Sequence, residues 1–264
     1  MDDLSGLPVM VLNMKQNRDR LERVQQRLKH HGLGNIHVIR GVSHDEPDDG
    51  LKEFLGPTPE QFARTERQYA AVFFDHIRAL RQFVHETTAP AAFIMEDDVM
   101  LRKGFLEIIA QAVHSPKQYG LILFSPYYTN PSCIDVCHWV EPGVFRISPG
   151  IFSSACYYVS RAGAISILKQ RDFPFGSAAQ PYRRMSSEDF LMDANPAVFM
   201  YPPLAVEECF STHIQPDAGL VAKRDYWKQF GIESDFLIPN EPIPNWLHES
   251  ETWISRPQFA QGCM

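Results

Sequence analysis

The sequence of 264 residues lacks several features that would assign it to a common class of protein. No apolar run approaches the ~18 residues that a membrane-spanning helix requires. The net charge is −7, and no basic run favours nucleic acid or an anionic membrane as a partner. The segment MDDLSG is acidic where a signal peptide would be basic. We therefore expect a cytoplasmic protein with no membrane-spanning segment and no nucleic acid partner.

Cysteine is scarce, and its pattern argues against a disulfide framework. The five cysteines are scattered along the chain: Cys133, Cys137, Cys156, Cys209 and Cys263. Cys133 and Cys137 form a candidate ligand pair, but no second pair follows to complete a zinc site. We expect reduced thiols, as in cytosolic proteins.

The glycine motifs GxxxxGK[ST] and GxGxxG, which bind phosphate groups, are also absent. A metal-dependent phosphotransferase or phosphohydrolase would need such a loop or a nucleophilic aspartate. This class of enzyme is therefore an alternative rather than the first hypothesis.

What the sequence does contain is an alternation of strand and helix patterns. An apolar run at 7–14 predicts a buried strand, and Leu21, Val24 and Leu28 follow at helical spacing. A second strand is expected at 35–42. Strand, helix and strand in this order favour a parallel βαβ unit.

An acidic turn is predicted at 43–50, after the second strand, and further strands and helices follow it along the chain. Strands are expected at 91–95, 119–125, 153–160 and 196–203, two short strands around Pro142, and helices at 58–88, 104–113, 161–170 and 186–195. We predict one α/β domain over 1–236 and a Pro-rich, irregular C-terminal tail over 237–264.

Three acids follow the strand at 91–95. Residues two apart in a strand share a face, so we expect Glu96 and Asp98 to point one way and Asp97 the other. They lie at the carboxyl end of a predicted parallel strand, where open α/β sheets bind ligands. Mn²⁺ or Mg²⁺ would neutralise them, and these ions in turn bind phosphates. The alternative is a polar strand end that caps the next helix.

Several segments resemble glycosyltransferase family 25, the bacterial lipopolysaccharide and animal collagen galactosyltransferase group. They occur in the family's order over about 8–215: Leu12-Asn13-Met14 with Arg18-Asp19-Arg20-Leu21, a helix with His76, the intact EDDV at Glu96–Val99, Tyr157–Ala164, Glu188-Asp189-Phe190-Leu191, and YPPLAVEE. The chain departs from the family pattern at the helix, where Asp75 replaces a serine and Ala70-Ala71 replace Gly-Cys.

The resemblance implies a GT-A-type nucleotide-diphospho-sugar transferase fold with a mostly parallel central sheet flanked by helices. The nucleotide-binding part would span about 7–125 and the acceptor-side part about 126–236. The implied activity is inverting, metal-dependent transfer of a hexose, galactose or glucose, from a UDP-sugar to a hydroxyl of a glycan or glycoprotein acceptor. The altered helix leaves a second reading open, a non-catalytic relative that binds sugar or serves as a protein-binding scaffold.

The resemblance also suggests roles at the metal. Asp98 and Glu96 would be ligands of Mn²⁺ or Mg²⁺, with His213 as a third ligand. Glu96 would alternatively touch the ribose, and Asp97 would contact the nucleotide or only orient the loop. The alternative for His213 is a hydrogen-bonding histidine at the surface or in the core. The general base would be Asp189, with Glu188 as the second choice, and the alternative for both is charge complementation at a helix N-terminus.

Nucleotide contacts are expected after the first strand. Asn13, Lys15 and Arg18 would lie near the base and phosphates, whereas Arg20 is expected on a solvated helix face. His76 would face the donor or be a buried helix histidine. Tyr127 and Tyr128 would stack on a sugar or simply pack.

Overall fold

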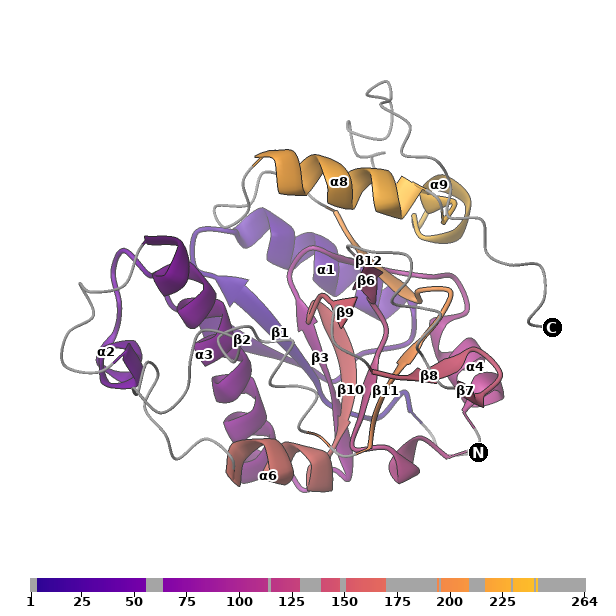
Figure 1. The fold of residues 1–264 in the computed structure, drawn as a ribbon, viewed down its shortest axis with the longest axis horizontal. Helices are drawn as coiled ribbons and strands as arrows, with labels where there is room; N and C mark the ends of the chain where they lie inside the picture. Colours follow the sequence, from indigo (N-terminus) through magenta and orange to yellow (C-terminus); the bar gives the residue numbers. More distant parts are fainter. Residues whose placement is uncertain are drawn as a thin grey trace.

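The computed structural model shows a central sheet with helices on both faces (Figure 1). The structure describes 4–55, 64–113, 115–128, 139–147, 151–169, 194, 196–208, 217–228, 230–239 and 241.

The largest sheet in the described part of the chain has eight strands in the order β2-β1-β3-β10-β5-β11-β8-β7. The bounds are β1 Val9–Met14, β2 Ile36–Gly41, β3 Ala91–Glu96, β5 Leu121–Leu123, β7 Trp139–Glu141, β8 Val144–Arg146, β10 Cys156–Ser160 and β11 Ala197–Met200. Following the pairings across the sheet, six strands point one way, and β10 and β8 point the other. The expected mostly parallel sheet is confirmed.

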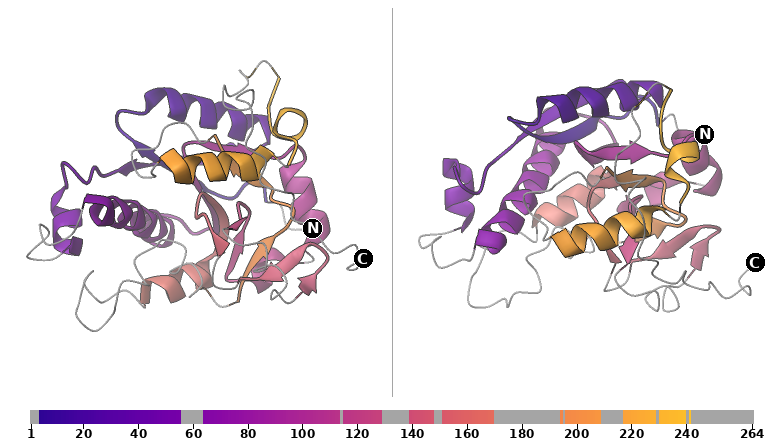
Figure 2. Two further views of the ribbon diagram at one scale, coloured as in Figure 1. Left: turned by 45° about the horizontal axis from the view of Figure 1, so that its top comes forward. Right: turned by 90° about the horizontal axis from the view of Figure 1, so that it is seen from above.

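The side chains of β1 alternate between the two faces of the sheet, and helices cover both faces. The helices are α1 Arg18–His30, α3 Arg64–Glu86, α4 Phe105–Ala112 and α6 Arg161–Lys169. Val9 and Val11 pack in a core with α1 and α4, whereas Met10 and Leu12 pack in a second core with α3 and α6 (Figure 2). Because side chains alternate along a strand, one continuous apolar run supplies both cores.

The strand order places a crevice at the end of β1. The chain passes from β1 through α1 to β2 on one side, and then through α3 to β3 on the other side of β1. β1 pairs in parallel with both neighbours, so three carboxyl ends meet at one edge. This reversal of strand order is where open α/β sheets bind ligands.

Further elements complete the described fold. They are α2 Asp49–Leu55, β4 Val99–Leu101, the 3-10 helix η2 Pro116–Gln118, β6 Tyr127–Tyr128, β9 Ile151–Phe152, β12 Ala205–Glu207, α8 Asp217–Lys228 and α9 Ile232–Asp235. β4 pairs with β12, and β6 pairs with β9, in two-stranded antiparallel sheets. Trp227 of α8 is buried with Met100 of β4 and Val206 of β12.

Some of these elements differ from the sequence prediction. The acidic turn expected at 43–50 gives way to α2 at Asp49, where Leu51 and Leu55 are buried against α3 residues. β4, β12 and α8 were not predicted, because segments of three residues carry too little periodicity and α8 depends on its packing partners. The predicted helix start at 58 lies outside the described residues, as does the predicted helix at 186–195 apart from residue 194.

The expected C-terminal tail is described only at its start. Leu237 is buried beside Trp227, and Glu241 pairs with Arg27 of α1. The division into a domain over 1–236 and a tail over 237–264 stays a prediction. None of the described helices combines the length and the hydropathy needed to cross a lipid bilayer.

Candidate functional site

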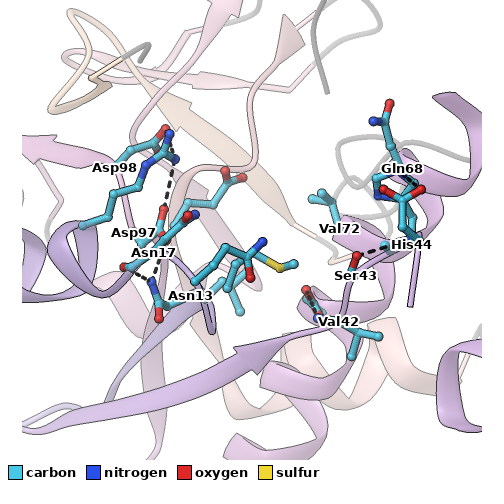
Figure 3. A pocket seen from close by; sticks show the side chains of 17 residues that line it. Asn13, Asn17, Val42, Ser43, His44, Gln68, Val72, Asp97 and Asp98 are labelled. Carbon is cyan, nitrogen blue, oxygen red and sulfur yellow. Dashed lines mark hydrogen bonds and ion pairs between the residues drawn. The ribbon is translucent and has the colours of Figure 1, made fainter. Parts of the chain in front are cut away.

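A cavity of about 440 Å³ opens at the carboxyl ends of β1, β2 and β3 (Figure 3). Its lining comes from these strand ends and from α1 and α3: Leu12, Asn13, Met14, Gln16, Asn17, Arg20, Val42, Ser43, His44, Asp45, Gln68, Ala71, Val72, Asp75, Glu96, Asp97 and Asp98. The volume lies in the range of small-molecule binding sites.

The two ends of the cavity differ in character. Figure 3 shows Asn13, Asn17, Asp97 and Asp98 on one side, and the group around His44 on the other. The first side groups Arg20 with Asp97 and Asp98, whereas the second mixes apolar side chains with polar ones that include Asp45 and Asp75. A ligand with one charged part and one part that has both apolar surface and hydrogen-bonding groups would match this arrangement.

The charged end is organised around Asp97. Asn13 at the end of β1 donates a hydrogen bond from Nδ2 to Oδ2 of Asp97 at 2.7 Å. Arg20 Nη1 lies 3.5 Å from Asp97 Oδ1 and 3.6 Å from Asp98 Oδ2. One guanidinium therefore bridges two neighbouring carboxylates, which would otherwise repel each other.

The predicted facing of the three acids is wrong. β3 ends at Glu96, and residues 97–98 form a turn, so the alternation of a strand does not extend to them. Asp97 and Asp98 both contact Arg20 of α1. Glu96 instead lies near His76 of α3, with 3.8 Å between Oε1 and Nε2. Glu96 therefore lies near α3, whereas Asp97 and Asp98 contact α1, and all three line the same cavity.

Asp98 differs from the other two acids in having a buried carboxylate oxygen without a hydrogen bond among the described residues. This oxygen is Oδ1. Burial raises the pKa of Asp98 well above the usual range, and the charges of Glu207, Glu96 and Asp97 raise it further, whereas Arg20 lowers it. An incoming cation would relieve both the desolvation and the repulsion.

Two acids that the sequence analysis missed lie behind Asp98. β12 pairs with β4, and this pairing places Glu207 opposite Val99. The Glu208 backbone N–H donates to the Asp98 carbonyl oxygen at 2.8 Å. Both acids stand in the quoted YPPLAVEE segment, so the signal was present, but a strand of three residues does not reveal its partner.

Glu207 belongs to a buried polar cluster. Ser153 Oγ donates to Glu207 Oε1 at 2.7 Å, and Lys223 of α8 forms an ion pair with the other carboxylate oxygen. Ser153 has a φ of 81°, in the left-handed region that non-glycine residues rarely adopt. Ser125 Oγ lies 3.1 Å from Ser153 Oγ and accepts from the Cys156 backbone N–H. The cluster links α8 to the sheet directly behind the acidic turn.

His76 is fully buried on α3, consistent with the expected buried helix histidine. Its Nδ1 lies 3.1 Å from the Tyr157 hydroxyl, and the two rings are tilted against each other. Its Nε2 side faces Glu96. His76 does not line the cavity, whereas its neighbour Glu96 does.

Asp75 occupies the wall formed by α3 and the end of β2. Its carboxylate accepts from the Val42 backbone N–H at 3.1 and 3.2 Å and lies 3.7 Å from Arg78 Nη1. Burial raises the pKa of Asp75 to about 7, against the opposing effects of the Val42 N–H and Arg78. Asp75 is thus a buried carboxyl of the cavity wall whose burial outweighs the effect of its polar contacts.

The first helix presents a row of arginines toward the acids. Arg20, Arg23 and Arg27 are spaced by three and four residues and so share one face of α1. Arg27 is buried and pairs with Glu208 and Glu241, and Arg23 pairs with Glu208 and Asp19. The expectation of a solvated face for Arg20 is wrong, because the rotation of α1 on the sheet turns this row inward.

Several predicted residues lie elsewhere. Lys15 and Arg18 are exposed and do not line the cavity. Tyr127 packs against Tyr226 and Trp227, with ring centroids 5.1 and 6.2 Å apart. The three remaining site residues, together with the Tyr128 side chain, fall outside the described residues: Glu188, Asp189 and His213.

The described residues test the expected metal site only in part. Within the described ranges, no three His, Cys, Asp or Glu side chains form a group that could hold a metal ion. Asp98 nevertheless offers a buried oxygen with no hydrogen-bond partner in that part of the chain, and oxygen donors suit Mg²⁺ or Mn²⁺. Of the cysteines, Cys156 is buried and carries a free thiol.

Comparisons with known proteins leave the family open. Neither protein-family models nor curated proteins match this sequence. Among solved structures, the chain is similar to the crystal structure of a glycosyltransferase involved in the glycosylation of the major capsid of PBCV-1. The identity is 12%, the match covers 78% of this chain and 95% of that chain, and the TM-score is 0.43. A likeness at this level identifies neither substrate nor mechanism, and the resemblance to family 25 stays a prediction.

Proposed function

We propose that the chain is an inverting, metal-dependent glycosyltransferase with a GT-A-type fold. It would transfer a hexose from a UDP-sugar to a hydroxyl of a glycan or glycoprotein acceptor. The observation that carries the proposal is the buried Oδ1 of Asp98, which has no hydrogen-bond partner among the described residues. It lies at the charged end of a cavity at the strand-order reversal. The ordered motifs that resemble family 25 supply the expected donor and acceptor classes.

The cavity suits a nucleotide diphosphate in size and polarity. The diphosphate would lie near Arg20, Asp97 and Asp98, and the nucleoside would extend toward Val42 and Val72. Asn17 precedes the first residue of α1 and lines the cavity, so the N-terminal end of the helix also favours a negative group there.

The metal would be held by Asp98, with Glu96 and His213 as the further proposed ligands. When bound, Mn²⁺ or Mg²⁺ supplies positive charge to the leaving diphosphate. The chain's own contribution is the placement of the acids: Asn13 holds Asp97, and the Glu208 N–H holds the backbone at Asp98.

Transfer by a single displacement needs one general base. The acceptor oxygen bonds to the anomeric carbon while the bond from that carbon to the diphosphate breaks, and UDP leaves. The acceptor proton passes to the base, for which we propose Asp189, with Glu188 as the second choice. Asp75 and Asp97 would shape the nucleotide pocket rather than take part in proton transfer.

The test is turnover over a panel of nucleotide sugars, with and without Mn²⁺. We expect Mn²⁺-dependent hydrolysis or transfer with UDP-hexoses, and little with other nucleotides. Binding of a nucleotide sugar without turnover would favour a non-catalytic relative. Release of inorganic phosphate from simple phosphoesters would favour a phosphohydrolase. Absence of both binding and turnover would contradict the proposal.

A further inference from the structure

We propose that Arg20 is an exchangeable counterion of the acidic turn, which gives up Asp98 to a divalent cation and turns from the two aspartates to the diphosphate of the nucleotide. The inference deepens the proposed function and rests on it. Its consequence is that metal and nucleotide bind cooperatively, because Arg20 opposes the metal until the nucleotide arrives.

The contacts of Arg20 are weak compared with those of the other arginines on the same face of α1. Its ion pairs with Asp97 and Asp98 span 3.5 and 3.6 Å. Arg27 donates a hydrogen bond of 3.0 Å to the Val99 carbonyl and also pairs closely with Glu208. Held by the backbone and by a buried acid, Arg27 is structural, whereas Arg20 can leave its partners at little cost.

The carboxylates stay in place when Arg20 leaves. Asp97 keeps the hydrogen bond of 2.7 Å from Asn13. The backbone at Asp98 keeps the hydrogen bond of 2.8 Å from the Glu208 N–H. Asp98 Oδ1 is buried with no hydrogen bond in the described part of the chain, so it is ready to accept a cation.

Arg20 is also placed to reach a phosphate. It lies in the first turn of α1, lines the cavity, and its side chain is 17% exposed. A guanidinium matches phosphate oxygens with paired hydrogen bonds, and such bonds are stronger than a long ion pair to a carboxylate. The move therefore needs only side-chain rotation into a cavity that already borders the group.

Charge explains why the exchange couples the two ligands. A divalent cation at Asp98 and a guanidinium between Asp97 and Asp98 repel each other, so Arg20 lowers the affinity for metal alone. A diphosphate removes that repulsion by pairing with both cations. By linkage, the nucleotide raises metal affinity by the same factor by which the metal raises nucleotide affinity.

The experiment is isothermal titration of the whole chain with Mn²⁺ alone, with UDP alone, and with each in the presence of the other. The variants are Arg20→Gln, which removes the charge, and Arg20→Lys, which keeps the charge but loses the planar fork. Arg23→Gln is the matched control, because Arg23 lies on the same face and pairs with Asp19 and Glu208 instead. Thermal unfolding checks that each variant is folded.

For Arg20→Gln we expect about tenfold tighter binding of Mn²⁺ alone and about tenfold weaker binding of UDP, with reduced coupling between them. Arg20→Lys should bind Mn²⁺ like the wild type but UDP more weakly, and Arg23→Gln should change neither. Unchanged or weaker Mn²⁺ binding in folded Arg20→Gln would overturn this inference but not the proposed function. An equal increase of Mn²⁺ affinity in Arg20→Lys and Arg20→Gln would do the same. Failure of the wild type to bind UDP with Mn²⁺ would instead overturn the proposed function, and this inference with it.

Discussion

Asn13 and Asp97 join the ends of two neighbouring parallel strands, through a hydrogen bond of 2.7 Å between side chains 84 residues apart in sequence. The amide of Asn13 also donates to the Asn17 carbonyl at 2.9 Å. One side chain therefore ties together β1, the start of α1 and the acidic turn after β3. Because a buried carboxylate is costly without donors, this bond helps to keep Asp97 charged inside the cavity.

Loss of the Asn13 amide should destabilise the protein. We expect Asn13→Ala to lower the free energy of unfolding by about 1–3 kcal/mol, since the Asp97 carboxylate loses its shortest hydrogen bond. Asn13→Asp should cost more, because it sets two carboxylates against each other. The double variant Asn13→Asp, Asp97→Asn should recover part of the loss. Urea unfolding measures all three, and an Asn13→Asp variant as stable as the wild type would contradict this account.

Asp75 should make stability depend on pH near neutrality. Its pKa is raised to about 7 from 3.8, so the folded protein binds this proton more tightly than the unfolded chain does. Protonation of Asp75 in the folded state contributes to the free energy of unfolding. This contribution is full below pH ~4 and is lost as the pH rises through about 7. This rise in pKa corresponds to a free energy on the order of 4 kcal/mol.

The test for Asp75 is Asp75→Asn, which keeps an acceptor for the Val42 N–H and removes the charge. We expect the variant to be more stable than the wild type at pH 8, with a difference that shrinks as the pH falls to 5. Asp49→Asn, at an exposed position in α2, is the control and should keep the wild-type pH profile. A constant difference between Asp75→Asn and the wild type across this range would rule out the titration.

The two acids of the turn should differ in their importance for turnover. We expect Asp98→Ala to abolish Mn²⁺-dependent donor turnover, because it removes the buried oxygen that has no hydrogen-bond partner among the described residues. Asp97→Asn should spare more activity, since its amide oxygen can still accept from Asn13. Turnover at increasing Mn²⁺ measures both. The reverse order would assign the metal to Asp97.

The general base is tested by Asp189→Asn. This substitution keeps size and hydrogen bonding but removes the basic lone pair, so donor binding should survive while transfer falls by ~10²–10⁴-fold. Glu188→Gln should cost far less. Transfer rates are measured beside donor affinity by calorimetry. If the effects are exchanged, the base is Glu188, and if both variants transfer normally, the base lies elsewhere.

The sequence by itself determined the framework of the site. A continuous apolar run predicted β1, helical spacing predicted α1, and three acids after a strand marked the edge where ligands bind. These signals are local, because the apolar run of a strand and the apolar spacing of a helix both involve residues that are close together in the sequence. Asn13 and the acids at 96–98 were therefore found without the structure.

Only the tertiary structure decided how these residues face one another. The ladder of β3 with β1 stops at Glu96, so the next two acids turn toward α1 instead of alternating. The rotation of α1 on the sheet, set by its apolar packing, brought Arg20 to Asp97 and Asp98. The pairing of β12 with β4 placed Glu207 behind Asp98 from more than a hundred residues away. Such contacts depend on the packing of distant segments, which no local pattern encodes.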